Sequence, residues 1–95
     1  MVVGVMELHL ALYDNESLKA KRSVVKRTIH RCRSTFNVSA AEVEDQDMTD
    51  RATIGVVTVG NDSRRIQSLL DKIENFVVGM AMADVLEAPK SVEFY

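Results

Sequence analysis

The stretch Arg51-Ala52-Thr53-Ile54-Gly55-Val56-Val57-Thr58-Val59, followed by Gly60-Asn61-Asp62-Ser63, says most about how the chain folds. Its β-branched residues predict a strand over Arg51–Val59, which Gly60-Asn61 ends. Asp62 or Ser63 can cap a following helix. That helix has a broad apolar stripe at helical spacing, made of Ile66, Leu69, Leu70, Ile73, Phe76, Val77 and Met80. The stretch therefore predicts a strand that feeds directly into an amphipathic helix.

The same order recurs towards the N-terminus. Alternating apolar residues predict a strand over Val2–Tyr13, with Met6, Leu8, Leu10 and Leu12 on its core face. The segment Asp14–Ser17 supplies turn residues and a helix cap, and the helix spans Leu18–Thr35. Its apolar stripe consists of Leu18, Val25, Ile29, Cys32 and Phe36. Asn37 is expected to leave the helix in a left-handed conformation.

Two further strands complete the pattern. A short strand is predicted over Val38–Glu44, and an acidic connection follows it. The tail, Asp84–Phe94, is predicted as an edge strand, because Pro89 cannot donate to a ladder. Two helices with one apolar stripe each cover only one face of a four-stranded sheet. Right-handed crossovers then predict an α+β fold of the ferredoxin-like split βαβ type (βαββαβ), with an antiparallel sheet whose central strands are the first and third.

Length and composition limit the class of protein. Ninety-five residues suit a single domain over 1–95, because two cores would each be too small. No window is apolar enough to span a membrane, so no membrane partner is expected. A single cysteine excludes an intrachain disulfide framework and suits a reducing cytoplasm. We therefore expect a soluble cytoplasmic domain.

The face of the sheet opposite the helices is expected to carry apolar residues. On the first strand this open face holds Val3, Val5, Ala11 and Tyr13. An exposed apolar sheet face usually marks a partner surface, and two-fold oligomers are the most common kind. The preferred prediction is homodimerisation through this face. The alternative is a half-solvated sheet with scattered apolar residues, which soluble proteins tolerate.

Charge is strongly segregated along the chain. The segment 17–36 holds seven of the 12 basic residues and no acidic one, so the remainder holds five basic residues with all 14 acidic ones. Five residues of the first helix advance by three, four, four and three and line one flank of its apolar stripe: Lys19, Arg22, Lys26, His30 and Arg33. Such a stripe can track a phosphate backbone, which favours structured RNA or a ribosomal particle as partner. A solvated or internally balanced helix face and an acidic protein partner remain open alternatives.

The residue types that would carry catalysis are sparse. Glu7 and His9 lie two residues apart on the open face, where an acid–base pair is conceivable but a surface or interface contact is more common. His30 and Cys32 point about 200° apart on a helix and cannot share a metal. The acidic run Glu42–Asp47 lacks the glycine and terminal glutamate of a calcium loop. We therefore expect no enzyme, metal, cofactor or small-molecule substrate.

Five stretches together resemble the YlxP-like family of small bacterial proteins, a domain of unknown function. They are Leu8–Leu10, Ser17–Arg22, Phe36–Val43, Arg51–Gly55 and Asn61-Asp62. The resemblance covers nearly the whole chain. It implies a ferredoxin-like fold, dimers, and genes that often lie among those for translation and ribosome maturation. It transfers no catalytic or binding residues, and it favours an RNA- or ribosome-related role.

Overall fold

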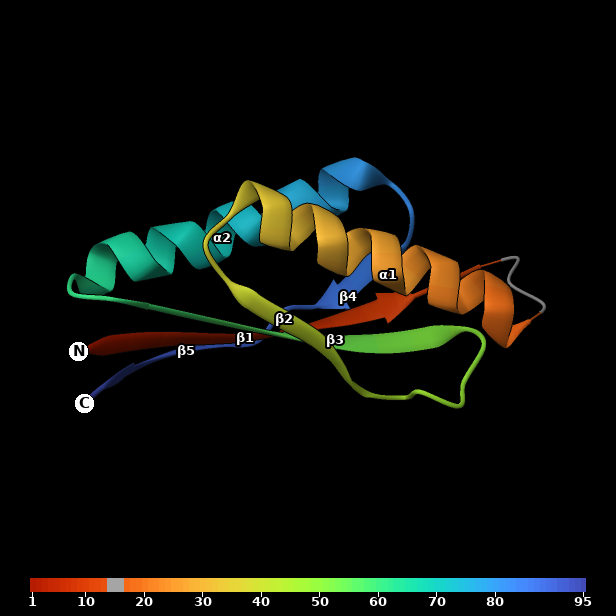
Figure 1. Ribbon diagram of the computed structural model, residues 1–95, viewed down its shortest axis with the longest axis horizontal. Coiled ribbons are helices and arrows are strands. Elements are labelled where there is room, and N and C mark those ends of the chain that lie inside the picture. The colour runs from red at the N-terminus through yellow and green to blue at the C-terminus, as the bar shows by residue number, and fades with distance from the viewer. Residues whose placement is uncertain (14–16) are drawn as a thin grey trace.

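A computed structural model describes residues 1–13 and 17–95 of the chain (Figure 1). Five strands and two helices follow one another in the order β1 (Val2–Ala11), α1 (Leu18–Thr35), β2 (Ser39–Glu44), β3 (Arg51–Gly60), α2 (Ser63–Met80), β4 (Asp84–Glu87) and β5 (Lys90–Phe94). The predicted order of strands and helices is confirmed. The turn predicted over Asp14–Ser17 lies largely outside the described residues, and only Ser17 can be compared.

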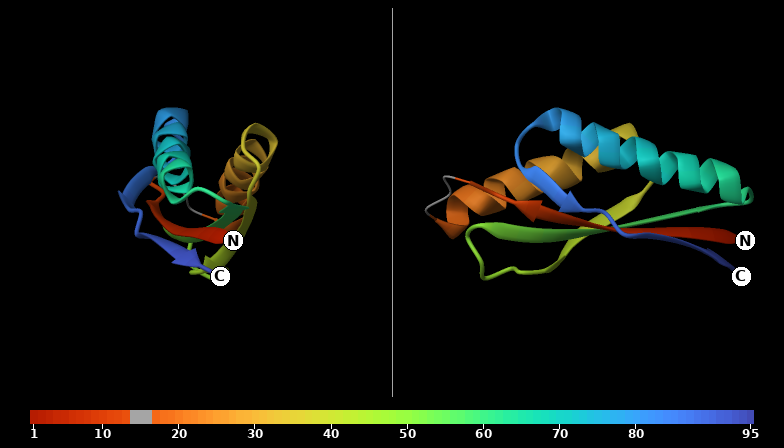
Figure 2. Two further views of the ribbon diagram at one scale, coloured as in Figure 1. Left: turned by 90° about the vertical axis from the view of Figure 1, so that its left-hand side faces the viewer. Right: turned by 180° about the vertical axis from the view of Figure 1, so that it is seen from behind.

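The strands form one antiparallel sheet in the order β2-β3-β1-β4, with β5 also paired to β1. The first and third strands are central, as predicted, and β1 pairs with β3 along its full length from Val2↔Gly60 to Ala11↔Arg51. Both helices lie on one face of the sheet, and within residues 1–13 and 17–95 the other face carries no helix (Figure 2). The α+β, ferredoxin-like architecture inferred from the sequence is confirmed.

The last strand is divided in two, which the sequence did not indicate. Both pieces pair with β1, and the register shifts between His9 and Leu10. Pro89 lies between β4 and β5. Because proline has no N–H, its place outside both strands leaves the hydrogen bonds of the sheet uninterrupted. Its carbonyl still accepts from the amide of Glu7 at 3.1 Å. The proline therefore marks a break at the edge of the sheet and not the middle of one strand.

Side-chain oxygens cap the starts of both helices. Ser17 accepts from the amide of Ala20, and Asp62 accepts from the amides of Arg64 and Arg65, which confirms both predicted caps. The end of α1 differs from the prediction. Phe36 leaves the helix in an extended conformation with φ −124°, and its amide bonds the carbonyl of Cys32. Asn37 is not among the residues with positive φ, so the left-handed exit was wrong.

Alternation along β1 and β3 divides the sheet into two faces. Met6, Leu8 and Leu10 join Ile54 and Val56 in the core beneath the helices. Residues opposite one another in an antiparallel ladder share a face. Four residues of β1 alternate with these core residues and therefore lie on the open face: Val3, Val5, Glu7 and His9. Their partners in β3 lie on the same face: Val59, Val57, Gly55 and Thr53.

Candidate functional site

The basic flank of α1 consists of Lys19, Arg22, Lys26, His30 and Arg33, and all five are exposed. Successive residues of a helix are rotated by about 100° about its axis. The mean direction of these five side chains therefore lies roughly 120° from that of the buried stripe of Val25 and Cys32. Arg31 points to the other side, where its guanidinium lies 5.5 Å from the centre of the Phe76 ring on α2. The basic flank therefore faces away from α2, on the side of the molecule where α1 packs over β2 (Figure 2).

Part of this flank is concave. Lys19, Arg22, Ser23 and Lys26 line a hollow of about 510 Å³ on the surface of the helix. Three cations and a hydroxyl group thus border one shallow, open space within two helical turns. Within residues 1–13 and 17–95, no member of the basic flank takes part in an ion pair. All five side chains are exposed, so an external anion can reach them.

Lys21 is the exception among the cations of α1, because its side chain is fully buried. Its Nζ donates to the carbonyl of Asp45 and lies 3.0 Å from Oε2 of Glu42. The Glu42 oxygen is buried and has no aligned hydrogen bond, so the contact is an ion pair and not a directed bond. The spacing of Lys21, Val25, Thr28 and Cys32 is four, three and four, and it places Lys21 on the buried face. This signal was present in the sequence, but Lys21 was counted there with the other cations of the segment.

A chain of polar contacts joins Lys21 to the open face through Asp45. The carbonyl of Asp45 faces Lys21, and its Oδ2 accepts from the hydroxyl of Thr53 at 2.9 Å. The same hydroxyl oxygen lies 3.4 Å from Nδ1 of His9, and Nε2 of His9 lies 3.3 Å from Oε1 of Glu7. Asp45 has a φ of 65°, so a left-handed turn lets its backbone and side chain reach opposite faces of the sheet.

The predicted Glu7–His9 contact thus exists, but Thr53 and Asp45 were not foreseen. No local sequence pattern could reveal them, because register alone places Thr53 opposite His9. Thr53 is fully buried and its proton is directed at Asp45, so its hydroxyl is not an accessible nucleophile. The contacts fix the positions of these side chains, and His9 and Glu7 remain partly exposed beside them.

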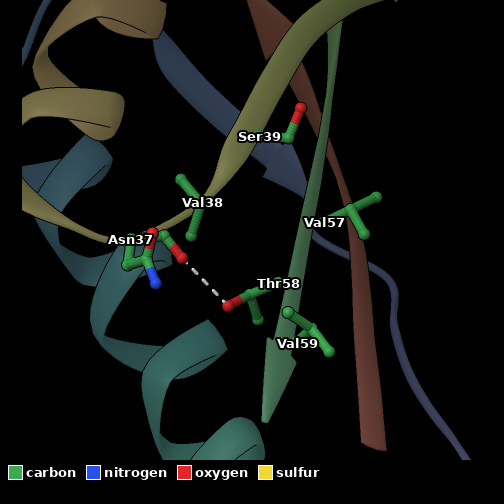
Figure 3. A pocket seen from close by; sticks show the side chains of 6 residues that line it. All are labelled: Asn37, Val38, Ser39, Val57, Thr58 and Val59. Carbon is green, nitrogen blue, oxygen red and sulfur yellow. Dashed lines mark hydrogen bonds between the residues drawn. The ribbon is translucent and has the colours of Figure 1, made fainter. Parts of the chain in front are cut away.

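The open face has one apolar half. Val57 and Val59 are 43% and 56% exposed, and Val3 and Val5 of β1 lie beside them. Figure 3 shows Val57 and Val59 on one side of β3 and Thr58 on the other, where its hydroxyl donates to the carbonyl of Asn37. Ser39, Val57 and Val59 also help to line a hollow of about 240 Å³ at the start of β2.

Two of the four predicted interface residues, Val3 and Val5, lie in this apolar half. Ala11 is 3% exposed and offers almost no surface to a partner. Tyr13 is 67% exposed, but it follows β1 at the opposite end of the sheet. The sequence-based prediction missed Val57 and Val59 as surface residues, although their alternation with Val56 and Thr58 could have shown them.

Other chemistry finds little support among the described residues. No group of three or more His, Cys, Asp or Glu side chains is placed to hold a metal ion in residues 1–13 and 17–95. Cys32 is buried, and burial raises the pKa of its thiol. In the same part of the chain, neither helix has the length and apolar character needed to span a membrane.

Comparison with known proteins identifies the family. Residues 3–89 match the model of a family described as "Protein of unknown function (DUF503)". The chain belongs to this family. A DUF503 relative is the uncharacterized protein YlxP of Bacillus subtilis (strain 168), with 33% identity over 76 residues that cover 80% of this chain and 83% of the relative. The resemblance to YlxP-like proteins noted from the sequence is confirmed.

Two solved structures share the fold of this DUF503 chain. One is a mutant of SnoaB, a cofactor-independent oxygenase from Streptomyces nogalater, with a TM-score of 0.51, 11% identity and coverage of 99% of this chain and 92% of that one. The other is LFR1 1, a de novo designed protein with a ferredoxin fold, with a TM-score of 0.51, 18% identity and coverage of 100% and 87%. At these identities the likeness concerns the fold alone.

Proposed function

We propose that this DUF503 protein is a binding module that presents the basic flank of α1 to structured RNA, free or within a ribosomal particle. The observation that carries the proposal is the exposure of Lys19, Arg22, Lys26, His30 and Arg33 along one side of a single helix. From the first to the last, the helix rises by about 21 Å. A rigid row of cations of this length can contact several phosphates of one backbone and release their counterions.

The surroundings of the flank favour phosphate contacts over base stacking. Among the described residues, the exposed Phe, Tyr and Trp side chains are Tyr13, Phe94 and Tyr95, which lie at the ends of strands and not on α1. Recognition of single-stranded RNA generally stacks bases on such side chains. A row of cations on a helix that has no Phe, Tyr or Trp fits the regular phosphate positions of a folded or double-stranded RNA.

Titration of a labelled RNA hairpin at several salt concentrations tests the proposal. The test variant carries Lys19→Ala, Arg22→Ala and Lys26→Ala, which empty the hollow on α1 of its cations. The control carries Arg64→Ala, Arg65→Ala and Lys72→Ala, three exposed cations of α2. Both variants lose three positive charges, one from α1 and the other from α2.

The wild-type protein is expected to bind with an affinity that falls steeply with salt. The α1 variant should lose about 0.7–0.9 of log–log slope per phosphate contact removed, or roughly two to three in total. The α2 variant should keep a slope close to that of the wild type. Equal losses in both variants would indicate a general effect of net charge, and absence of binding by the wild type would contradict the proposal outright.

A second candidate function is a homodimeric regulatory or interaction module that does not bind nucleic acid. The apolar half of the open face supports this candidate, because Val57 and Val59 expose hydrocarbon that a solvated sheet would replace by polar groups. Sedimentation in the absence and presence of RNA separates the candidates. A stable dimer whose sedimentation RNA leaves unchanged would favour the second.

A further inference from the structure

The charge along the basic flank of α1 is uneven. Between Lys19 and Lys26, over a rise of about 10 Å, the flank has three lysine or arginine side chains, with Arg22 in the middle. The equal rise from Lys26 to Arg33 adds only one, Arg33 itself, together with His30. An even row suits a run of phosphates, each with one negative charge. A cluster of three cations suits a single group with more than one negative charge.

The three clustered cations border the hollow on α1 together with Ser23. Because successive residues are rotated by about 100°, Lys19 and Lys26 lie within about 20° of one another around the helix axis. Arg22 lies about 50° to one side of the line that joins them, and Ser23 lies about 50° to the other side. The four side chains thus form the corners of a diamond. Three corners carry a long cationic side chain, and the hydroxyl at the fourth can donate one hydrogen bond.

The cluster places like charges next to one another. Arg22 is three residues from Lys19 and four from Lys26, the spacings at which side chains on a helix are neighbours, so both pairs repel. Lys19 also lies in the first turn, where the helix dipole disfavours a cation and where α1 has no acidic residue. Sequences that break such local rules commonly do so at functional sites. A bound anion would offset both repulsions.

We propose that the hollow binds a phosphate monoester, the group at a phosphorylated RNA end and in a free nucleotide. Such a group carries a charge of about −1.5 to −2 at pH 7 and three strong acceptor oxygens. A phosphodiester within a nucleic acid carries a single negative charge and fewer free oxygens. Three cations and a hydroxyl therefore match the monoester better than the diester.

The shape of the hollow agrees with a ligand group at the end of a chain. Because the space is shallow and open, a terminal phosphate can enter it while the rest of the ligand stays outside. Binding of an RNA end rests on the proposed function, since the hollow is part of the basic flank, whereas binding of a free nucleotide does not. The two sources share one chemistry, and two separate measurements distinguish them.

Paired titrations measure what a terminal phosphate adds to RNA binding. One RNA hairpin with a short single-stranded overhang is prepared in two forms, with a phosphate or a hydroxyl at the end of the overhang. Both forms share every internal phosphate, so the ratio of their affinities isolates the monoester. The wild type is expected to bind the phosphorylated form about tenfold more tightly, the effect of one or two added charge-assisted hydrogen bonds.

Arg22→Gln and Arg33→Gln are the matched pair of variants. Both remove one exposed arginine of the basic flank, but only Arg22 borders the hollow. Arg33→Gln should weaken binding of both hairpins and keep the ratio of the wild type. Arg22→Gln and Ser23→Ala should each lower the ratio at least about threefold, because each removes a donor to the monoester. Circular dichroism confirms folding, and if Arg22→Gln fails to fold, Ser23→Ala decides the result.

Thermal unfolding with adenosine monophosphate tests the hollow without RNA. The nucleotide should raise the melting temperature of the wild type and of Arg33→Gln, because it binds only the folded chain, and should raise that of Arg22→Gln less. Adenosine at the same ionic strength is the control and should raise none of them.

The two measurements together assign the ligand. A preference for the phosphorylated hairpin supports the proposal with an RNA end as ligand. A rise in melting temperature with equal affinity for the two hairpins supports it with a free nucleotide as ligand. If neither hairpin binds but the nucleotide stabilises the chain, the proposed function fails and the phosphate site stands. Neither a preference nor a rise, or effects that Arg22→Gln reduces no more than Arg33→Gln, would overturn the proposal.

Discussion

Lys21→Met is the substitution expected to affect stability most among the cations of α1. Methionine retains most of the aliphatic volume of lysine, so the change chiefly removes the ammonium group. That group contacts the carbonyl of Asp45 and the carboxylate of Glu42, and the lysine side chain is fully buried. Without it, Glu42 becomes a largely buried carboxylate with no cation beside it.

The magnitude follows from the environment of Glu42. Removal of one partner from a buried ion pair usually costs about 3–5 kcal/mol, because the remaining charge loses its compensation. The Glu42 side chain is 18% exposed, and water can reach part of it. We therefore expect the lower end of that range, about 3 kcal/mol, which lowers the melting temperature of a domain of this size by roughly 12–24 °C.

Urea denaturation followed by circular dichroism measures this loss. Lys19→Met is the matched control, because Lys19 is an exposed lysine of the same helix, and its loss should change the free energy of unfolding by under about 0.5 kcal/mol. The double variant Lys21→Met with Glu42→Leu removes both charges. It should recover most of the lost stability, because an apolar pair can replace a buried ion pair at little cost.

Two results would contradict this account of Lys21. A loss below about 1 kcal/mol in Lys21→Met would show that the ammonium compensates no buried charge. Strictly additive effects in the double variant would show that the two side chains do not interact, because residues in direct contact normally deviate from additivity by at least about 0.5 kcal/mol.

Three further expectations concern other residues. Thr53→Val should lower the free energy of unfolding by about 1–2 kcal/mol in urea denaturation, because it removes the hydrogen bond to a carboxylate, and Thr53→Ser should retain most of it. Gly4→Ala should lower the free energy of unfolding by about 1–3 kcal/mol, because the new Cβ would lie 2.5 Å from Cγ2 of Ile66. Gly79→Ala should raise it by up to about 1 kcal/mol, because its Cβ meets nothing within 4 Å. Melting temperatures equal to that of the wild type would contradict both expectations. Burial raises the pKa of the Cys32 thiol above 9.0 in the folded chain. The contribution of the buried thiol to the free energy of unfolding is therefore complete below pH 9.0, and it falls as the pH rises through the higher folded-state pKa. Urea midpoints of wild type relative to Cys32→Ala should therefore decrease above pH 9.0, and a constant difference would contradict the assignment.

Some local features could be predicted because nearby residues determine them. The β-branched run over 51–59 and the apolar stripe from Ile66 to Met80 each reflect a periodicity that holds within one strand or helix. Capping by Asp62 depends only on the next few backbone amides. The exit of α1 was predicted incorrectly, because Asn37 permits a left-handed turn without requiring one, and the chain must instead extend at Phe36 to enter β2.

The ferredoxin-like architecture and the row of cations on α1 could be read from the sequence alone, because hydrophobic period and helical spacing are properties of short segments. Only the folded chain shows that Lys21 pairs with Glu42, away from that row. Only the folded chain places Thr53 between His9 and Asp45. The folded chain also extended the apolar surface from Val3 and Val5 to Val57 and Val59. These contacts join residues on different strands and helices, and the register of the sheet, which no single segment specifies, brings them together.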